Sequence, residues 1–217
     1  IMKKLTTILF VLVFASSMAF AQSNSATVNQ TGDNAEATVT QISDQVGDNT
    51  ASIDQLMANS NYTASILQDG DENEASVTQN GGNFKESTVE QIGHRNEATV
   101  TAEGGGRANV SDIYQTGNDN DASITMGLVS SASSTIDQTG NKNEGFVIAL
   151  DAGTADITQT GDENYASIDS GFYSAGSNSF VTQTGDLNIG TIVQGTTGNA
   201  ATINQTGNSN TSNISQN

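Results

Sequence analysis

The sequence predicts an all-β fold, a two-layer β-solenoid in which each coil contributes one strand to each layer. Three observations lead to this prediction. A motif recurs every 21 to 24 residues, apolar or amide side chains alternate with small polar ones inside each copy, and Gly with Asp or Asn separates the copies. Repeats of this length are typical of solenoids, and a period of two is typical of strands.

The first 21 residues are expected to be an export signal and not part of the fold. Lys3 and Lys4 precede an apolar run over residues 5–14, and Ala19-Phe20-Ala21 follows. A basic start, a short apolar run and an Ala-x-Ala site are typical of a cleaved secretory signal peptide. We therefore expect residues 1–21 to be removed and residues 22–217 to form one repeat domain of a secreted protein.

The composition of the remaining chain excludes several classes of partner and site. Without Lys3 and Lys4, four Lys and Arg stand against 24 Asp and Glu. Such a chain repels nucleic-acid phosphates and anionic lipid headgroups, so we expect no nucleic-acid partner and no membrane insertion. The absence of Cys excludes disulfides and thiolate metal sites. Leu, Ile, Val and Phe are so few that a core requires an economical arrangement.

The clearest copy of the motif runs from Gln68 to Gln79 and reads QDGDENEASVTQ. The pattern Gln-x-Gly-x-x-Asn-x-small-x-Val/Ile starts again at Gln91, Gln115, Gln138, Gln159, Gln183 and Gln205. Weaker copies that keep only the second half of the motif lie between the strong ones. Together they give 17 segments, each with a small side chain two residues before a Val or Ile.

Four positions of each segment are expected to face one side of a strand, because they are two residues apart. The Val or Ile positions, expected to form the core, are Val28, Val39, Ile53, Ile66, Val77, Val89, Val100, Ile113, Ile124, Ile136, Val147, Ile157, Ile168, Val181, Ile192, Ile203 and Ile214. Two residues later, Gln occupies 13 of the 17 segments, among them Gln30, Gln41, Gln68, Gln79, Gln91, Gln115, Gln138, Gln159, Gln183, Gln194, Gln205 and Gln216. Four residues before the Val or Ile, Asn occupies 11 of the 17 segments, among them Asn73, Asn96, Asn120, Asn143, Asn164, Asn188 and Asn210.

Each coil is expected to hold about 23 residues, as strand, arc, strand and arc, so that 17 strands make roughly 8.5 coils. At the usual spacing between strands the stack would be about 40 Å tall. Like positions would lie above one another, and buried amides would pair along the stack as in cross-β assemblies. Glycines expected in the arcs are Gly32, Gly70, Gly93, Gly117, Gly140, Gly161, Gly185 and Gly207. The register is weakest over residues 41–68, where residues 45–49 compete as a second arc.

Neither catalysis nor a cofactor is expected. His94, the single imidazole, lies in a variable arc position beside Arg95, where an exposed turn residue is the simpler interpretation. The Gly-Gly-x-Gly-x-Asp motif of Ca²⁺-binding coils does not recur, so no metal site is expected. Five aromatic residues are expected on variable or outward positions, namely Tyr62, Tyr114, Phe146, Tyr165 and Phe180.

The motif, repeated over residues 24–216 behind a signal peptide, resembles the curlin repeat of curli-type bacterial functional amyloids. The resemblance implies a secreted subunit that polymerises with itself into cell-surface fibres of a Gram-negative bacterium. It also implies adhesion and aggregation in a biofilm matrix, with an outer-membrane secretion pore and a nucleator subunit as partners. In that family the Gln and Asn positions promote assembly, and arc residues such as Gly70 and Asp71 temper it. The present chain has more repeats than the familiar five-repeat subunits, and its repeats begin at Asn24 without a separate targeting segment.

The first and last segments, residues 24–30 and 212–216, are both complete repeats, so we expect both ends of the stack to accept another copy. Contacts of this head-to-tail kind do not close and give a fibre. Three alternatives are considered. The chain could be the minor nucleator of the same fibre, a monomeric solenoid adhesin, or an ice-binding solenoid, for which Thr38-Val39-Thr40 and Thr99-Val100-Thr101 supply outward Thr pairs.

Overall fold

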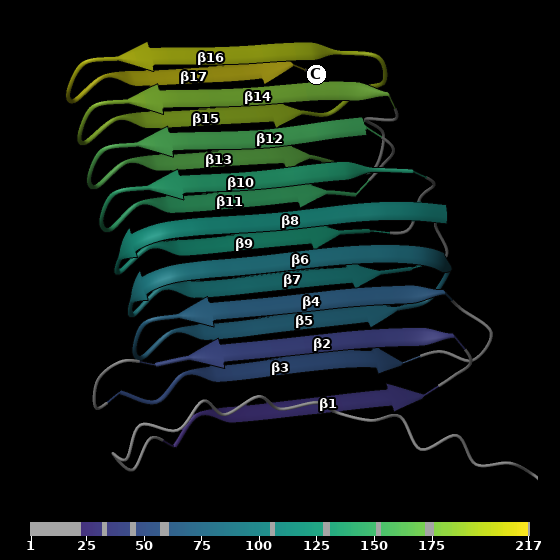
Figure 1. Ribbon diagram of the computed structural model, residues 1–217. Helices are drawn as coiled ribbons and strands as arrows, with labels where there is room; N and C mark the ends of the chain where they lie inside the picture. The colour runs from purple at the N-terminus through teal and green to yellow at the C-terminus, as the bar shows by residue number, and fades with distance from the viewer. Residues whose placement is uncertain are drawn as a thin grey trace, which may run out of the picture.

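The computed structural model describes residues 23–31, 34–43, 47–56, 61–104, 107–127, 131–150, 153–171 and 176–216, which form two parallel β-sheets (Figure 1). The expected signal peptide lies outside the described residues. The odd-numbered strands form sheet A, in the order β1 (Ser25–Thr31), β3 (Thr50–Leu56), β5 (Glu74–Asn80), β7 (Glu97–Glu103), β9 (Asp121–Met126), β11 (Glu144–Ala149), β13 (Tyr165–Ser170), β15 (Ile189–Gln194) and β17 (Thr211–Gln216). The even-numbered strands form sheet B, in the order β2 (Ala35–Ile42), β4 (Tyr62–Asp69), β6 (Asn83–His94), β8 (Arg107–Asn118), β10 (Ser133–Thr139), β12 (Gly153–Thr160), β14 (Ser177–Thr184) and β16 (Ala200–Thr206).

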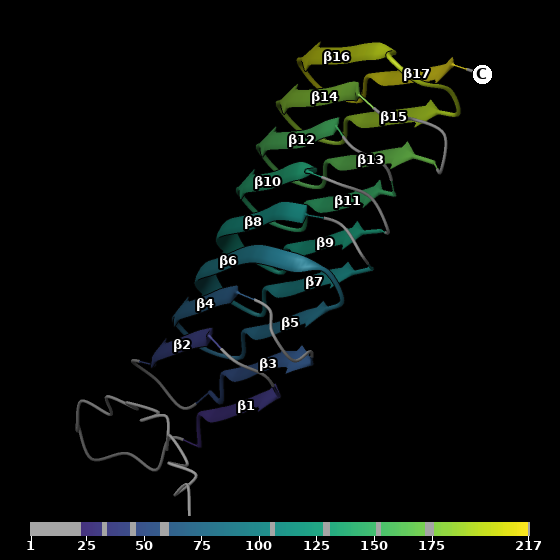
Figure 2. The same ribbon diagram turned by 90° about the vertical axis from the view of Figure 1, so that its right-hand side faces the viewer.

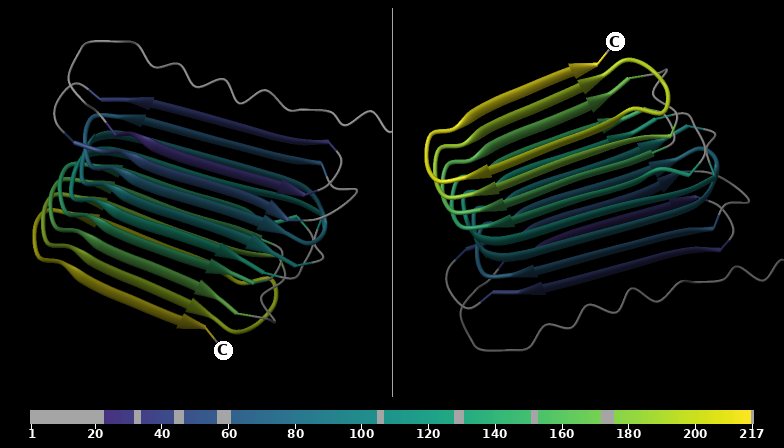
Figure 3. Two further views of the ribbon diagram at one scale, coloured as in Figure 1. Left: turned by 90° about the horizontal axis from the view of Figure 1, so that it is seen from below. Right: turned by 90° about the horizontal axis from the view of Figure 1, so that it is seen from above.

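The chain winds from one sheet to the other and rises by one strand with each coil, so the two sheets lie face to face (Figures 2 and 3). Every strand pair inside a sheet is parallel. The predicted two-layer β-solenoid is therefore confirmed, and the nine and eight strands of the two sheets agree with the 17 predicted segments.

The register places like side chains on like side chains. In sheet A, Val77 pairs with Ile53 on one side and with Val100 on the other. In sheet B, Val89 pairs with Ile66 and with Ile113. The same correspondence holds for each Val or Ile of the predicted core positions, so a single column of branched side chains runs through each sheet.

The core is thin because small side chains of one sheet face large ones of the other. A Cβ atom added at Gly145 in β11 would lie 3.0 Å from Ile136 Cγ2 and 3.1 Å from Gln138 Nε2, both in β10. The branched side chains in the middle coils are fully buried, as in Ile113 and Ile124. Parallel sheets are usually covered on both faces, but here a single layer of apolar residues between two sheets suffices.

The two ends of each coil differ. From β4 onward, the connections from sheet B to sheet A are short and repeat closely, with a glycine at strongly positive φ three residues before an Asn, as over residues 70–73. The connections from sheet A to sheet B vary in length and contain several of the stretches outside the described residues, Gly32 among them. This difference explains why only every second segment carries the complete motif.

Two expectations from the sequence change with the structure. Tyr62 is not outward but buried, with 1% of its surface exposed, because it occupies the inward position that Asn holds in other strands. The Thr38/Thr40 and Thr99/Thr101 pairs lie on β2 and β7, which belong to opposite sheets. They cannot form the single flat array that an ice-binding face requires.

The arc glycines generate the first testable prediction. Gly117 has a φ of +123°, and a Cβ atom at this position would lie 1.9 Å from the carbonyl oxygen of Gly140 in the next arc. We expect Gly117→Ala to destabilise the fold by roughly 3 kcal/mol or more, because backbone atoms would have to move. Gly171→Ala is the matched control, since its added Cβ would approach nothing closer than 3.7 Å. Equal denaturant midpoints for the two variants would show that close packing between arcs does not restrict Gly117.

Candidate functional site

An uninterrupted ladder of glutamine side chains runs along the inner face of sheet B, with one glutamine, or rung, from each strand. Nε2 of each rung donates a hydrogen bond to Oε1 of the next rung, over distances of 2.8 to 3.0 Å. The eight rungs are Gln41, Gln68, Gln91, Gln115, Gln138, Gln159, Gln183 and Gln205. All seven links point in the same direction, from the N-terminal to the C-terminal end of the stack.

The second amide hydrogen of these rungs is also used. It is donated to a backbone carbonyl at the start of a sheet A strand, for example from Gln91 to Glu74 at 3.0 Å and from Gln138 to Asp121 at 3.0 Å. Buried amides are costly unless both hydrogens and the oxygen find partners. The ladder therefore satisfies each interior amide and ties sheet B to sheet A.

The glutamine ladder of sheet A is interrupted. Gln30, Gln55 and Gln79 are linked at 2.7 and 2.9 Å, and Gln194 is linked to Gln216 at 2.9 Å. Four apolar or small rungs lie between these groups, namely Ala102, Met126, Ala149 and Ser170. They are the four segments that lack Gln in the sequence. Only the topology reveals that they are consecutive in one sheet.

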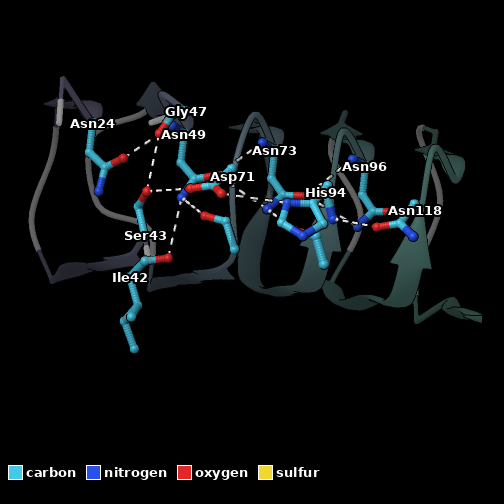
Figure 4. Close-up of polar contacts among 12 residues, drawn as sticks. Asn24, Ile42, Ser43, Gly47, Asn49, Asp71, Asn73, His94, Asn96 and Asn118 are labelled. Carbon is cyan, nitrogen blue, oxygen red and sulfur yellow. Dashed lines mark hydrogen bonds and ion pairs between the residues drawn. The ribbon is translucent and has the colours of Figure 1, made fainter. Parts of the chain in front are cut away.

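A third ladder consists of asparagines at the arcs that lead into sheet A (Figure 4). The backbone N of each Asn donates a hydrogen bond to Oδ1 of the preceding Asn in the ladder. From Asn73 onward, the side-chain Nδ2 donates to the same oxygen. Asn96, for example, makes both bonds to Asn73 at 3.1 Å. In the interior rungs up to Asn143, Nδ2 also reaches an arc glycine carbonyl, as from Asn96 to Gly117 at 2.9 Å. The bonds of this ladder run opposite to those between the glutamines.

The asparagine ladder also includes two residues near its N-terminal end that fit the repeat pattern, two residues before Ala26 and Ala51. Asn49 is buried, accepts from Asn73 and donates to the carbonyl of Gly70 at 2.7 Å. Asn24 accepts from the backbone N of Asn49 at 3.1 Å. Gln55, two residues after Ile53, is a fully buried rung of sheet A. In the irregularly spaced stretch over residues 41–68, the arc that precedes β3 is the competing one that contains Gly47 and Asn49.

The arcs carry a ladder of alternating charge. Its successive rungs, one per coil, are Glu72, Arg95, Asp119, Lys142 and Glu163, all with φ near +57°. Arg95 forms two hydrogen bonds with Asp119, at 2.6 and 2.9 Å, and Lys142 Nζ lies 3.5 Å from Glu163 Oε1. The bonded Arg95 guanidinium lowers the pKa of Asp119. Opposite charges on adjacent rungs attract one another, so these pairs favour the stacking of the arcs.

The outer face of sheet A has the opposite character, a column of like charges. Glu74, Glu97, Asp121 and Glu144 are direct register neighbours on β5, β7, β9 and β11. Burial first, and the charges of Glu97 and Glu144 second, raise the pKa of Asp121. On sheet B, burial is also the main cause that raises the pKa of Asp112 and of Asp156. These carboxylates weaken the stack when they are ionised.

No catalytic arrangement is found among the described residues. His94 is partly exposed, and its Nδ1 lies 3.6 Å from Asp71 Oδ2. Within the described ranges, no three His, Cys, Asp or Glu side chains are placed to hold a metal ion. A helix able to span a membrane is likewise not found in the part of the chain that the structure describes.

The raised carboxyl pKa values predict an unusual dependence of stability on pH. Because folding raises the pKa of Asp112, Asp121 and Asp156, their protonation favours the folded state. This stabilisation is complete below the ordinary Asp value of 3.8 and is lost as the pH rises through the raised values. We expect Asp121→Asn to stabilise the fold at pH 7 by about 0.5–1 kcal/mol and to reduce the difference in unfolding midpoint between pH 7 and pH 5.

Asp119→Asn is the control of opposite sign, because Asp119 is paired with Arg95 and its pKa is lowered. Denaturant unfolding at several pH values measures both variants. A stabilising effect of Asp119→Asn at pH 7, or a destabilising effect of Asp121→Asn, would contradict these assignments.

Comparison with known families supplies an independent assignment. The profile of the Curlin associated repeat matches residues 47–81 and 151–185. The first match covers β3 to β5, with Asn49, Gln68 and Asn73 in their ladders, and the second covers β12 to β14. A comparison with curated proteins finds no match. The two matched segments have the same ladder geometry as the strands around them, and the chain carries two copies of the Curlin associated repeat.

Proposed function

We propose that this chain is a secreted structural subunit that assembles head to tail into curli-like amyloid fibres. One observation carries the proposal. The hydrogen bonds of each amide ladder all point in one direction, and the ladders reach both ends of the stack, so that a second copy of the chain can extend them. The fibres would serve adhesion and cell aggregation in the biofilm matrix of a Gram-negative bacterium. The two copies of the Curlin associated repeat support an extracellular fibre and a structural role.

The two ends of the stack present matching edges. β1 and β2 form one end, β16 and β17 form the other, and no described strand pairs with their outer edges. Unpaired edges of parallel strands are templates for further strands. The edge segments carry the same side-chain columns as the interior, so a second copy can continue the Val/Ile, Gln and Asn columns in register.

The direction of the hydrogen bonds favours one orientation of the second copy. Gln30 and Gln41 have no preceding rung to donate to their Oε1 atoms, while Gln205 and Gln216 have no following rung to accept from their Nε2 atoms. Bringing the C-terminal end of one copy onto the N-terminal end of another joins donors to acceptors. Joining two like ends would oppose donor to donor or acceptor to acceptor. The proposed fibre is therefore polar.

The acidic surface keeps fibres apart and slows their growth. Arc carboxylates such as Asp162, Glu163 and Asp186 repel neighbouring filaments, and the column from Glu74 to Glu144 also opposes stacking. Salt screens such repulsion, so salt and divalent cations should shorten the lag before growth. The proposed partners follow from the family, namely an outer-membrane secretion pore that passes the chain after removal of residues 1–21, and a nucleator subunit.

The experiment is the assembly of residues 22–217 diluted from denaturant, followed by thioflavin T and electron microscopy. We expect sigmoidal growth into filaments, with a lag that preformed fibres and added salt shorten. A β-rich monomer that stays unassembled for days would contradict the proposal.

A pair of variants separates edge growth from nonspecific aggregation. Ile214→Lys places a charge on the inward side of edge strand β17, where the next copy must pack, and Ser215→Lys places the same charge on its outward side. We expect Ile214→Lys to slow elongation from preformed seeds by about tenfold or more, and Ser215→Lys to elongate at the parent rate or faster. Equal rates for the two variants would show that growth does not proceed through this edge.

A further inference from the structure

Two buried side-chain nitrogens without partners lie on adjacent rungs of sheet B. Lys85 in β6 and Asn109 in β8 are register neighbours on the inner face, and each has 1% of its surface exposed. Lys85 Nζ and Asn109 Nδ2 form no hydrogen bond. Unpaired buried donors are rare in native structures and call for an explanation. A buried ammonium that makes no hydrogen bond is costlier still.

The two residues occupy the inward position that asparagine ladders use in sheet A. In sheet A, from Asn73 onward, each Asn Nδ2 donates to Oδ1 of the rung before it. The rung before Asn109, however, is Lys85, and the rung before Lys85 is Tyr62. In the facing column of sheet A, the glutamines stop at Gln79, and the next two positions are Ala102 and Met126. The glutamine column of sheet A therefore offers no amide oxygen at these levels of the stack.

The burial of Lys85 favours its unprotonated amine over the ammonium form. Burial lowers the pKa of Lys85, and the charge of Glu103 opposes this shift in part. A desolvated lysine with a lowered pKa is the usual form of a nucleophilic lysine. Asn109 presents the electrophile, because its Oδ1 accepts a hydrogen bond from the backbone N of Ala132 at 3.4 Å, which polarises the amide carbonyl. The spacing between adjacent strands, about 4.8 Å, is shorter than an extended lysine side chain.

We propose that Lys85 and Asn109 condense into an intramolecular amide bond that links β6 to β8. In this step Lys85 Nζ attacks Asn109 Cγ, the Nζ–Cγ bond forms and the Cγ–Nδ2 bond breaks. A proton passes from Nζ to Nδ2, and ammonia leaves, so that no oxidant or cofactor is needed. Glu103, the carboxylate whose charge acts on Lys85, is the group that relays this proton.

One condensation replaces the two unpaired nitrogens by a single amide N–H. The charged or basic nitrogen of Lys85 becomes a neutral amide nitrogen, and the unpaired Nδ2 of Asn109 is released. The product is a covalent link between two successive coils of sheet B near the middle of the stack. The bond can form only in the folded chain, because residues 24 positions apart come together only when the coils stack.

The test uses the fact that Arg95 and Arg107 are the two arginines of the chain. Arg-specific proteolysis of residues 22–217, folded and then unfolded in denaturant, should give fragments 22–95, 96–107 and 108–217. We expect fragments 22–95 and 108–217 to migrate as one species, lighter than their summed sequence masses by one ammonia. Fragment sequencing should then place the branch at Lys85 and Asn109. A chain kept in denaturant from its synthesis should give three separate fragments.

Variants make the assignment specific. Lys85→Met keeps the buried aliphatic stem and should abolish the link, as should Asn109→Ala, while Glu103→Gln should slow its formation. Lys142→Met, at an exposed lysine paired with Glu163, is the control and should retain the link. Separate fragments of full sequence mass from a chain that has formed fibres would overturn the proposal and would leave an unbonded pair or a bound water or anion as the explanation. A linked chain that never forms fibres would instead overturn only the proposed function.

Discussion

The structure depends on one constraint. Each inward side chain must pack against a side chain of the same type directly above and below it, at the spacing of parallel strands. Amides meet this constraint best, because a primary amide has donors and an acceptor and can bond to its copy along the stack. Branched apolar side chains meet it by packing, and small ones leave room for the facing sheet. Charges of one sign do not meet it. This explains how a chain with so few large apolar residues forms a buried interior. In β6, for example, Val89 and Gln91 occupy successive inward positions and are both fully buried.

Where charged side chains do stack, their arrangement differs between surfaces. In the arcs, acidic and basic rungs alternate from Glu72 to Glu163, so that neighbouring rungs attract one another. On the outer face of sheet A, acidic rungs follow one another from Glu74 to Glu144 and oppose stacking. In the proposed fibre, the first arrangement favours the folded subunit, and the second slows the association of subunits.

Much of the architecture could be predicted from the sequence because periodicity two and a repeat near 23 residues are local, redundant signals. Each Val and Ile of the core columns was assigned in this way. Asn49 and Gln55 fit the same pattern, two residues before Ala51 and two residues after Ile53, although insertions widen the spacing around them. Tyr62 and Lys85 lie four residues before Ile66 and Val89, so the period of two places both inward, and the expectation of an outward Tyr62 was wrong because it did not apply that period. The interruption of the sheet A glutamines becomes visible only when alternate segments are assigned to different sheets.

The most direct test of the central claim, that the solenoid of one copy continues into the next, is the mass per unit length of the fibres. If each copy contributes its whole stack along the fibre axis, one chain occupies about 40 Å, and a single filament has a mass of roughly 0.5 kDa per Å. Scanning transmission electron microscopy of unstained fibres measures this quantity. A value of roughly 4 kDa per Å would mean that each chain occupies one strand layer of about 4.8 Å, as in fibrils of flattened chains stacked in register, and would contradict the claim.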